Sequence, residues 1–185
     1  MNLSFDMLFS IALGLGLAAA TGFRVFVPLL VAGLAARADY IPLLDSFAWL
    51  ESTPALLALG TAAVIETLAF YIPGVDHLLD VLAGPLAIVA GVLASASVMV
   101  DLPAEVRWPI AIIAGGGAAG ITKTTAALIR AKSTALTGGL GNPVVSTAET
   151  AGAATVSVLA ILAPVVCVVA AIVLAIYVFR KLRRY

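Results

Sequence analysis

The chain has 185 residues, of which 63% are hydrophobic and 11% charged, and its mean hydropathy is +1.17. Soluble domains are about half apolar and about a quarter charged, so this composition indicates an integral membrane protein. Ten basic and ten acidic residues give a formal net charge of zero, and no basic run precedes the C-terminal end, which argues against a nucleic-acid partner. The single cysteine excludes an intrachain disulfide and a CxxC pair.

Hydropathy predicts an all-α, polytopic transmembrane helical bundle that forms a single domain, 1–185. The opening MNLSFDM lacks the basic start of a cleaved signal, so the first apolar stretch is expected to stay as a span. A spanning helix needs about 20 mainly apolar residues. The six stretches that qualify are 7–36, 54–72, 80–100, 108–130, 143–161 and 165–181. Residues 150–179 form one uncharged run that only Pro164 divides, so the last two stretches could be a single span, which would leave five spans.

Charge and aromatic residues predict the orientation of the bundle. Basic residues near span ends favour the cytoplasm, and Trp and Tyr gather at the membrane interfaces. The tail RKLRRY therefore places the C-terminus inside, and six spans place the N-terminus there too, in the inner (plasma) membrane. Segments 37–52 and 101–108 are then external and carry interfacial aromatic residues. The interfacial aromatic residues are Tyr40, Trp49 and Trp108. The segment 74–80, together with Arg130 and Lys132, is predicted to be cytoplasmic.

A weak internal match suggests two halves. GLGLAAAT (14–21) aligns with GGGAAGIT (115–122), pairing Thr21 with Thr122, and a basic residue, Arg24 or Lys123, follows each threonine. Many transporters consist of three-helix repeats with inverted orientation, which would here be 7–100 and 108–182. Glycine and alanine are so common in this chain that they can align by chance, so coincidence is the alternative explanation of the match.

Four charged residues lie within predicted spans: Arg24, Glu66, Lys123 and Glu149. A charge at the bilayer centre costs about 2.5–3.5 kcal/mol on insertion scales, so such residues usually face a protein interior or a water-filled path. Two acids and two bases could form one neutral cluster near mid-depth. This cluster is either a set of ion pairs that holds helices together or a binding site for a solute or ion.

Glycines beside these charges favour the binding-site interpretation modestly. Gly22 and Gly115–Gly117 are candidate breaks in the first and fourth spans, and broken helices expose backbone groups that can line a cavity. Thr21, Gly22 and Thr122 therefore join the four charged residues as candidate binding residues. A polar and flexible stretch is expected at 133–150. Close helix packing through small residues explains the same glycines without a ligand.

The stretch YIPGVDHLLD (71–80) concentrates further polar residues at the predicted cytoplasmic interface. Asp76, His77 and Asp80 fall on one helical face and could bind a divalent metal, or His77 could respond to pH. An interfacial helix cap has the same composition. No catalytic motif occurs, so neither an enzyme nor a cofactor is predicted.

The motifs ATGFRVFVPLLVAGLAAR (20–37) and ETLAFYIPGVDHLLDVLAGPLAIVAG (66–91) resemble an uncharacterised bacterial and plastid membrane family, domain of unknown function 4126. The resemblance covers most of the chain and implies a membrane protein, but it brings no substrate. The plan of two repeats and six spans is also similar to that of the lysine-exporter superfamily, by analogy alone.

These observations predict a small permease or channel-like protein that moves a small solute or ion, anionic if the bases contact it, through the buried polar cluster. The alternative is a membrane scaffold or assembly protein in which the charges are structural ion pairs. The expected partners are the lipid bilayer, the small solute or ion and, because a chain this small often works as a dimer, a second copy.

Overall fold

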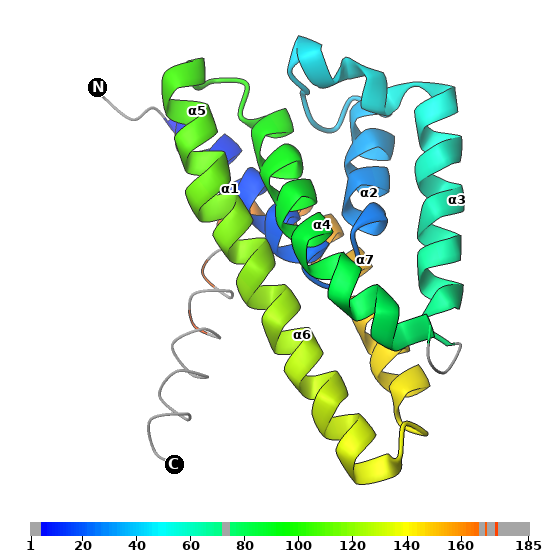
Figure 1. The fold of residues 1–185 in the computed structure, drawn as a ribbon. Coiled ribbons are helices and arrows are strands. Elements are labelled where there is room, and N and C mark those ends of the chain that lie inside the picture. Colours follow the sequence, from blue (N-terminus) through cyan, green and yellow to red (C-terminus); the bar gives the residue numbers. More distant parts are fainter. Residues whose placement is uncertain (1–4, 72–74, 167–168, 170–172, 174–185) are drawn as a thin grey trace.

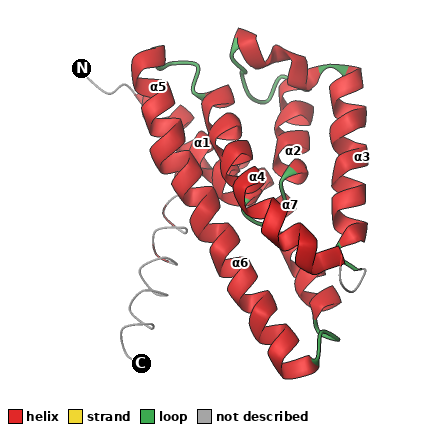
Figure 2. Ribbon diagram, in the orientation of Figure 1, coloured by secondary structure: helices red, strands yellow, loops and turns green. Residues whose placement is uncertain are grey.

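A computed structural model describes residues 5–71, 75–166, 169 and 173, with the backbone alone at 75–81. All regular elements in these ranges are helical, which confirms the predicted fold class (Figures 1 and 2). The sixth predicted span, 165–181, and the basic tail lie largely outside the described residues. The elements are α1 (Phe5–Thr21), α2 (Phe26–Arg37), η1 (Asp45–Glu51), α3 (Thr53–Ala69), α4 (Val75–Val98), α5 (Ala104–Ile110), η2 (Ala111–Gly115), α6 (Gly116–Thr137) and α7 (Asn142–Leu162).

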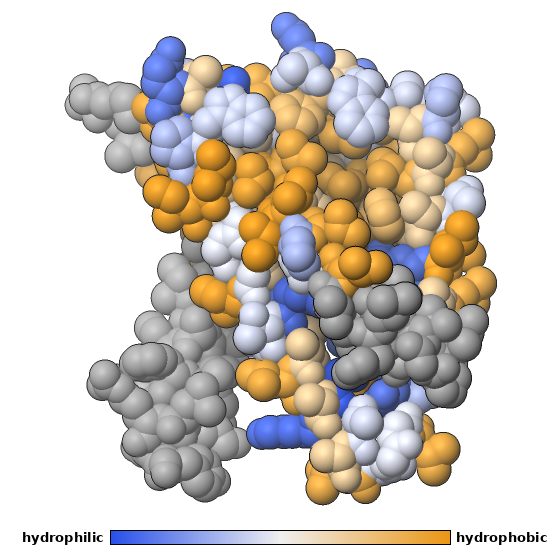
Figure 3. Space-filling view, viewed as in Figure 1, coloured by the Kyte–Doolittle hydropathy of each residue, from blue (hydrophilic) through white to orange (hydrophobic). Residues whose placement is uncertain are grey.

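Small residues fill the interior and large apolar residues cover the surface. Most buried hydrophobic positions are alanines, whereas Leu57, Ile113 and Ile121 are each more than 60% exposed. Hydrophobic side chains spread over much of the visible face below a rim of hydrophilic ones (Figure 3). Soluble proteins rarely expose apolar surface on this scale, and small residues at helix contacts are typical of membrane bundles.

Two helices in the described part of the chain are long and apolar enough to cross a membrane, Ala104–Thr137 and Asn142–Leu162. A third span results if η1 and α3, which are bent by 66° relative to each other, count as one. Ser52 begins α3 by accepting a hydrogen bond from the amide of Ala55. The total number of spans stays a prediction, because most of the last predicted span, 165–181, lies outside the described residues.

The prediction of one continuous span over 7–36 is wrong, because α1 and α2 form a hairpin. Gly14 on α1 lies against Ser95, near the end of α4, whereas Thr21 bonds to the carbonyl of Ala87, two turns earlier on α4. The chain then returns, and the amide of Leu44, beyond α2, donates to the carbonyl of Ser97. The hairpin tip, residues 22–25, therefore lies about halfway along α4, and both hairpin ends lie on the same side.

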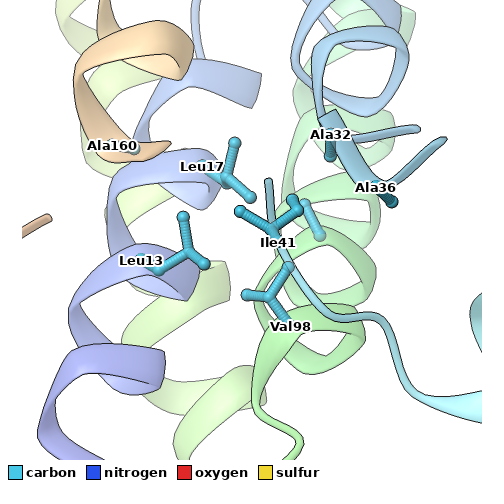
Figure 4. Close-up of a cluster of buried hydrophobic side chains, with 8 residues drawn as sticks. Leu13, Leu17, Ala32, Ala36, Ile41, Val98 and Ala160 are labelled. Atoms are coloured by element: carbon cyan, nitrogen blue, oxygen red, sulfur yellow. The ribbon is translucent and has the colours of Figure 1, made fainter. Parts of the chain in front are cut away.

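An apolar cluster fills the hairpin between its tip and its open end. Leu13 and Leu17 of α1 meet Ile41 and Val98 there (Figure 4). The other members are Ala32, Ala36, Ala94 and Ala160. We call this set the apolar cluster. Ile41 follows α2 and Val98 ends α4, so the apolar cluster lies towards the end of the bundle that carries η1 and the start of α5 (Figure 1).

The hairpin changes the predicted orientation. A first span would have separated the N-terminus from segment 37–52, but the start of α1 and the segment that follows α2 lie on the same side (Figure 1). An internal N-terminus and an external 37–52 segment cannot both hold. The predicted placement of both termini in the cytoplasm therefore no longer follows from the predicted spans.

The break that was predicted in the fourth span does not occur. The helix runs continuously from Ala104 to Thr137, and η2 is one wider, π-helical turn within it. Gly115 brings this turn against α4, because a Cβ there would lie 2.7 Å from the Cβ of Ser95. The stretch 133–150 is mainly helical, with a short turn at 138–141 where Gly138 has a φ of 60°.

Candidate functional site

Arg24 lies at the hairpin tip and is 1% exposed. Its Nε donates to Thr150 Oγ1 at 3.0 Å, and its Nη2 donates to the carbonyl oxygen of Ser146 at 3.0 Å and to Ser146 Oγ at 2.5 Å. Ser146 and Thr150 are one turn apart on α7, so they present their oxygens along one side of that helix. Neutral acceptors on α7 thus fix the guanidinium in place.

Glu149 lies on the same part of α7 and contacts two arginines. Its Oε2 is 3.4 Å from Arg24 Nη1 and accepts a hydrogen bond from Nη2 of Arg130 on α6. All three side chains are at least nine-tenths buried. Low dielectric strengthens such contacts, and breaking a buried pair by removing one partner typically costs about 3–5 kcal/mol.

The ring of Phe70, at the end of α3, is the common neighbour of three cations. The Cζ atoms of Arg24 and Arg130 each lie 4.2 Å from the ring centroid, and Lys123 Nζ lies 5.5 Å from it. A cation within about 6 Å of an aromatic face is attracted to it, more strongly when water is excluded. Phe70 is itself buried, so the ring forms an apolar wall of the charged site.

Glu66 serves the hairpin tip rather than a basic side chain. Its Oε1 accepts from the amide of Val25 at 2.9 Å, and its Oε2 accepts from the amide of Phe26 at 3.2 Å. Amides at a helix N-terminus have no partner within the helix, and the helix dipole favours a carboxylate there. Pro28 fits the first turn of α2 because its missing N–H is not needed there. Glu66 therefore stabilises the start of α2.

The remaining predicted residues support the tip. Thr21 donates to the carbonyls of Ala18 and Ala87, which joins the end of α1 to α4. Gly22 packs on α6, since a Cβ there would lie 2.5 Å from the Ala119 carbonyl oxygen and from Thr122 Cβ. Gly22 and Thr122 are thus packing residues. The side chains of Asp76, His77 and Asp80, the predicted metal trio, lie outside the described residues.

The structure brings Arg24, Lys123 and Glu149 into one cluster and places Glu66 at the adjoining tip. We call Arg24, Phe70, Lys123, Arg130 and Glu149 the charged cluster. It occupies the middle of the bundle, between the hairpin tip and the α6–α7 turn. A model of the domain of unknown function DUF4126 matches residues 11–184.

The chain belongs to the DUF4126 family. No curated protein and no solved structure gave a match. The family description assigns no function, and the charged cluster is the candidate functional site of this DUF4126 member.

Sequence reasoning missed two members of the charged cluster in this DUF4126 protein. The sequence predicts a cytoplasmic position for Arg130, because basic residues near span ends usually lie there. Its position seven residues after Lys123, two helical turns on the same face, was the available signal. Phe70 carries no comparable signal, because an aromatic residue in an apolar helix is ordinarily a packing residue.

Proposed function

We propose that the protein is a small permease or channel of the inner (plasma) membrane that moves a small anionic solute or ion. The charged cluster is the binding site, and Arg24 and Arg130 are the residues that contact the anion. Lys123 adds a third positive charge beside the same ring.

The observation that carries this proposal is the hairpin that places Arg24 halfway through the bundle. Non-helical backbone at membrane depth is tolerated where it is buried in protein or lines a polar path. Transporters use discontinuous helices of this kind to bring helix ends and charges to a solute at the midplane. The turn at residues 22–25, with Arg24 held by α7, has that arrangement.

The scaffold alternative requires the same charges to act as structural ion pairs. A buried carboxylate shared by two arginines is a known form of structural ion pair. Here Glu149 is shared by two arginines, and the carboxylate of Glu66 binds backbone amides. These contacts suit a scaffold as well as a binding site, so the hairpin, and not the number of carboxylates, supports the permeation proposal.

Anion flux into proteoliposomes tests the proposal. Vesicles that contain the purified protein are placed in potassium chloride, nitrate, lactate or phosphate with valinomycin, and swelling is followed by light scattering. We expect swelling in at least one salt for the wild type and for Arg37→Gln, an exposed arginine at the far end of α2. Arg24→Gln should lose most of it.

Arg24→Lys covers the case in which the glutamine variant does not fold, because it keeps the charge while losing the hydrogen bonds to Ser146 and Thr150. It should insert normally and conduct at a reduced rate. Equal swelling of vesicles with and without wild-type protein in all four salts would reject permeation of these anions and favour the scaffold.

A further inference from the structure

We infer that the anionic group of the solute is a carboxylate, and that it binds between Arg24 and Arg130 by displacing the side chain of Glu149. This inference rests on the proposed function, since it names the ligand chemistry of the same site. Glu149 thus acts as an internal carboxylate that closes the site until a solute replaces it.

The hydrogen bonds of Arg24 make this exchange feasible. Two of its three nitrogens, Nε and Nη2, bind Ser146 and Thr150, while Nη1 faces Glu149 at 3.4 Å. Departure of the Glu149 side chain therefore leaves Arg24 in position. A receptor whose geometry survives without its ligand avoids the cost of reordering when the ligand binds.

The shape of the site suits a carboxylate. Two guanidinium groups face one carboxylate oxygen of Glu149, and both lie over the ring of Phe70. Planar guanidinium groups match carboxylate oxygens in geometry and form short, charge-assisted hydrogen bonds with them. A spherical halide lacks this directional match. The place that Glu149 fills therefore already has the dimensions and charge for one small carboxylate.

The exchange needs an entry route for the carboxylate, and we place it from the polar contacts on one side of the charged cluster. Towards the α6–α7 turn, Tyr71 Oη and Thr147 Oγ1 share an exposed hydrogen bond of 2.6 Å, and Asn142 bonds with Thr134. Towards the other side the apolar cluster fills the hairpin. A carboxylate would therefore reach Arg24 from the side of the α6–α7 turn.

Chemical rescue tests the exchange. Glu149→Ala removes the internal carboxylate, and the melting temperature of the purified variant is measured in detergent against sodium formate, acetate, chloride or phosphate at constant ionic strength. We expect formate and acetate to raise it, with a half-maximal concentration about tenfold or more below that of the wild type, because an attached competitor acts at high effective concentration. The exposed matched control Glu105→Gln should respond as the wild type does.

One further variant and one alternative measurement keep the result decisive. Adding Arg130→Gln to Glu149→Ala should abolish the response to formate. If Glu149→Ala does not fold alone, its yield when purified in formate and in chloride replaces the melting temperature. Equal responses to chloride and formate, a stronger response to phosphate, or no response would overturn the carboxylate assignment. Swelling in chloride or phosphate alongside a failed rescue would leave the proposed function standing, and rescue without flux in any salt would reject permeation alone.

Discussion

Gly22→Ala should separate the hairpin tip from α6 and detach Arg24 from α7. The new Cβ would lie 2.5 Å from the Ala119 carbonyl oxygen and 2.8 Å from the backbone nitrogen of Lys123. Ordinary contact begins near 3.4 Å, so the tip must withdraw by about 0.9 Å, and backbone atoms cannot rotate away as a flexible side chain would. Overpacking of this kind typically costs about 1–3 kcal/mol of stability.

The same shift has a consequence at the charged cluster. Arg24 is two residues from Gly22, and its bonds to Thr150 and to the Ser146 carbonyl are 3.0 Å long. A withdrawal of about 0.9 Å would lengthen these contacts beyond the range of a hydrogen bond. Gly22→Ala should therefore lower both the free energy of unfolding and the anion flux.

Unfolding in mixed micelles with increasing SDS measures the effect, and two glycines provide controls. Gly60 and Gly117 lie in helices with nothing within 4 Å of an added Cβ. Alanine at either position should raise the free energy of unfolding by about 0.5–1 kcal/mol, because glycine is a poor helix former. A Gly22→Ala protein as stable as these controls would refute the close approach of the tip to α6.

Three further substitutions test other contacts. Glu66→Gln should lower the free energy of unfolding by about 1 kcal/mol, because one amide oxygen replaces the two carboxylate oxygens that cap Val25 and Phe26. The control Glu51→Gln, on the surface, should change the free energy of unfolding little, and equal effects of the two substitutions would contradict the cap. Ser95→Ala should leave stability unchanged or raise it by about 1 kcal/mol, because Ser95 Oγ is buried with no hydrogen-bond partner among the described residues, and a clear loss in the same SDS titration would reveal a missing partner. Phe70→Leu should weaken anion binding more than Phe47→Leu does, because a leucine keeps the apolar wall but loses the cation–π contacts. The measurement is the melting temperature of each variant against formate concentration in the Glu149→Ala background. Identical responses would remove Phe70 from the site.

The helical class and the buried charges could be predicted from the sequence, because composition and the cost of charges in apolar segments are local properties. Arg24, Lys123 and Glu149 meet as expected. The hairpin was missed because 7–36 is uniformly apolar, and hydropathy reports length but not direction. The length of the stretch 7–36 exceeds the roughly 20 residues that one span needs, and Gly22 and Pro28 lie near its middle. These two features were the available signal.

The partners of Glu66 could not be predicted for a different reason. A carboxylate within a span is expected to pair with a base, and two bases were at hand in the sequence. The backbone amides of Val25 and Phe26 became acceptable partners only because the chain turns there and begins a new helix. Such donors depend on where a helix starts, which side-chain chemistry alone does not reveal.

The π-helical turn at Ala111–Gly115 sets the rotational phase between α5 and α6. A π turn contains about one residue more than an α turn, and each residue rotates a regular helix by about 100°. Winding these residues as an ordinary α-helix, with no deletion, would rotate Arg107 and Trp108 by about 100° relative to α6, whereas deleting one residue at the same time would keep both in place. The wider winding of this short stretch therefore determines which way the α5 end of the longest described helix faces.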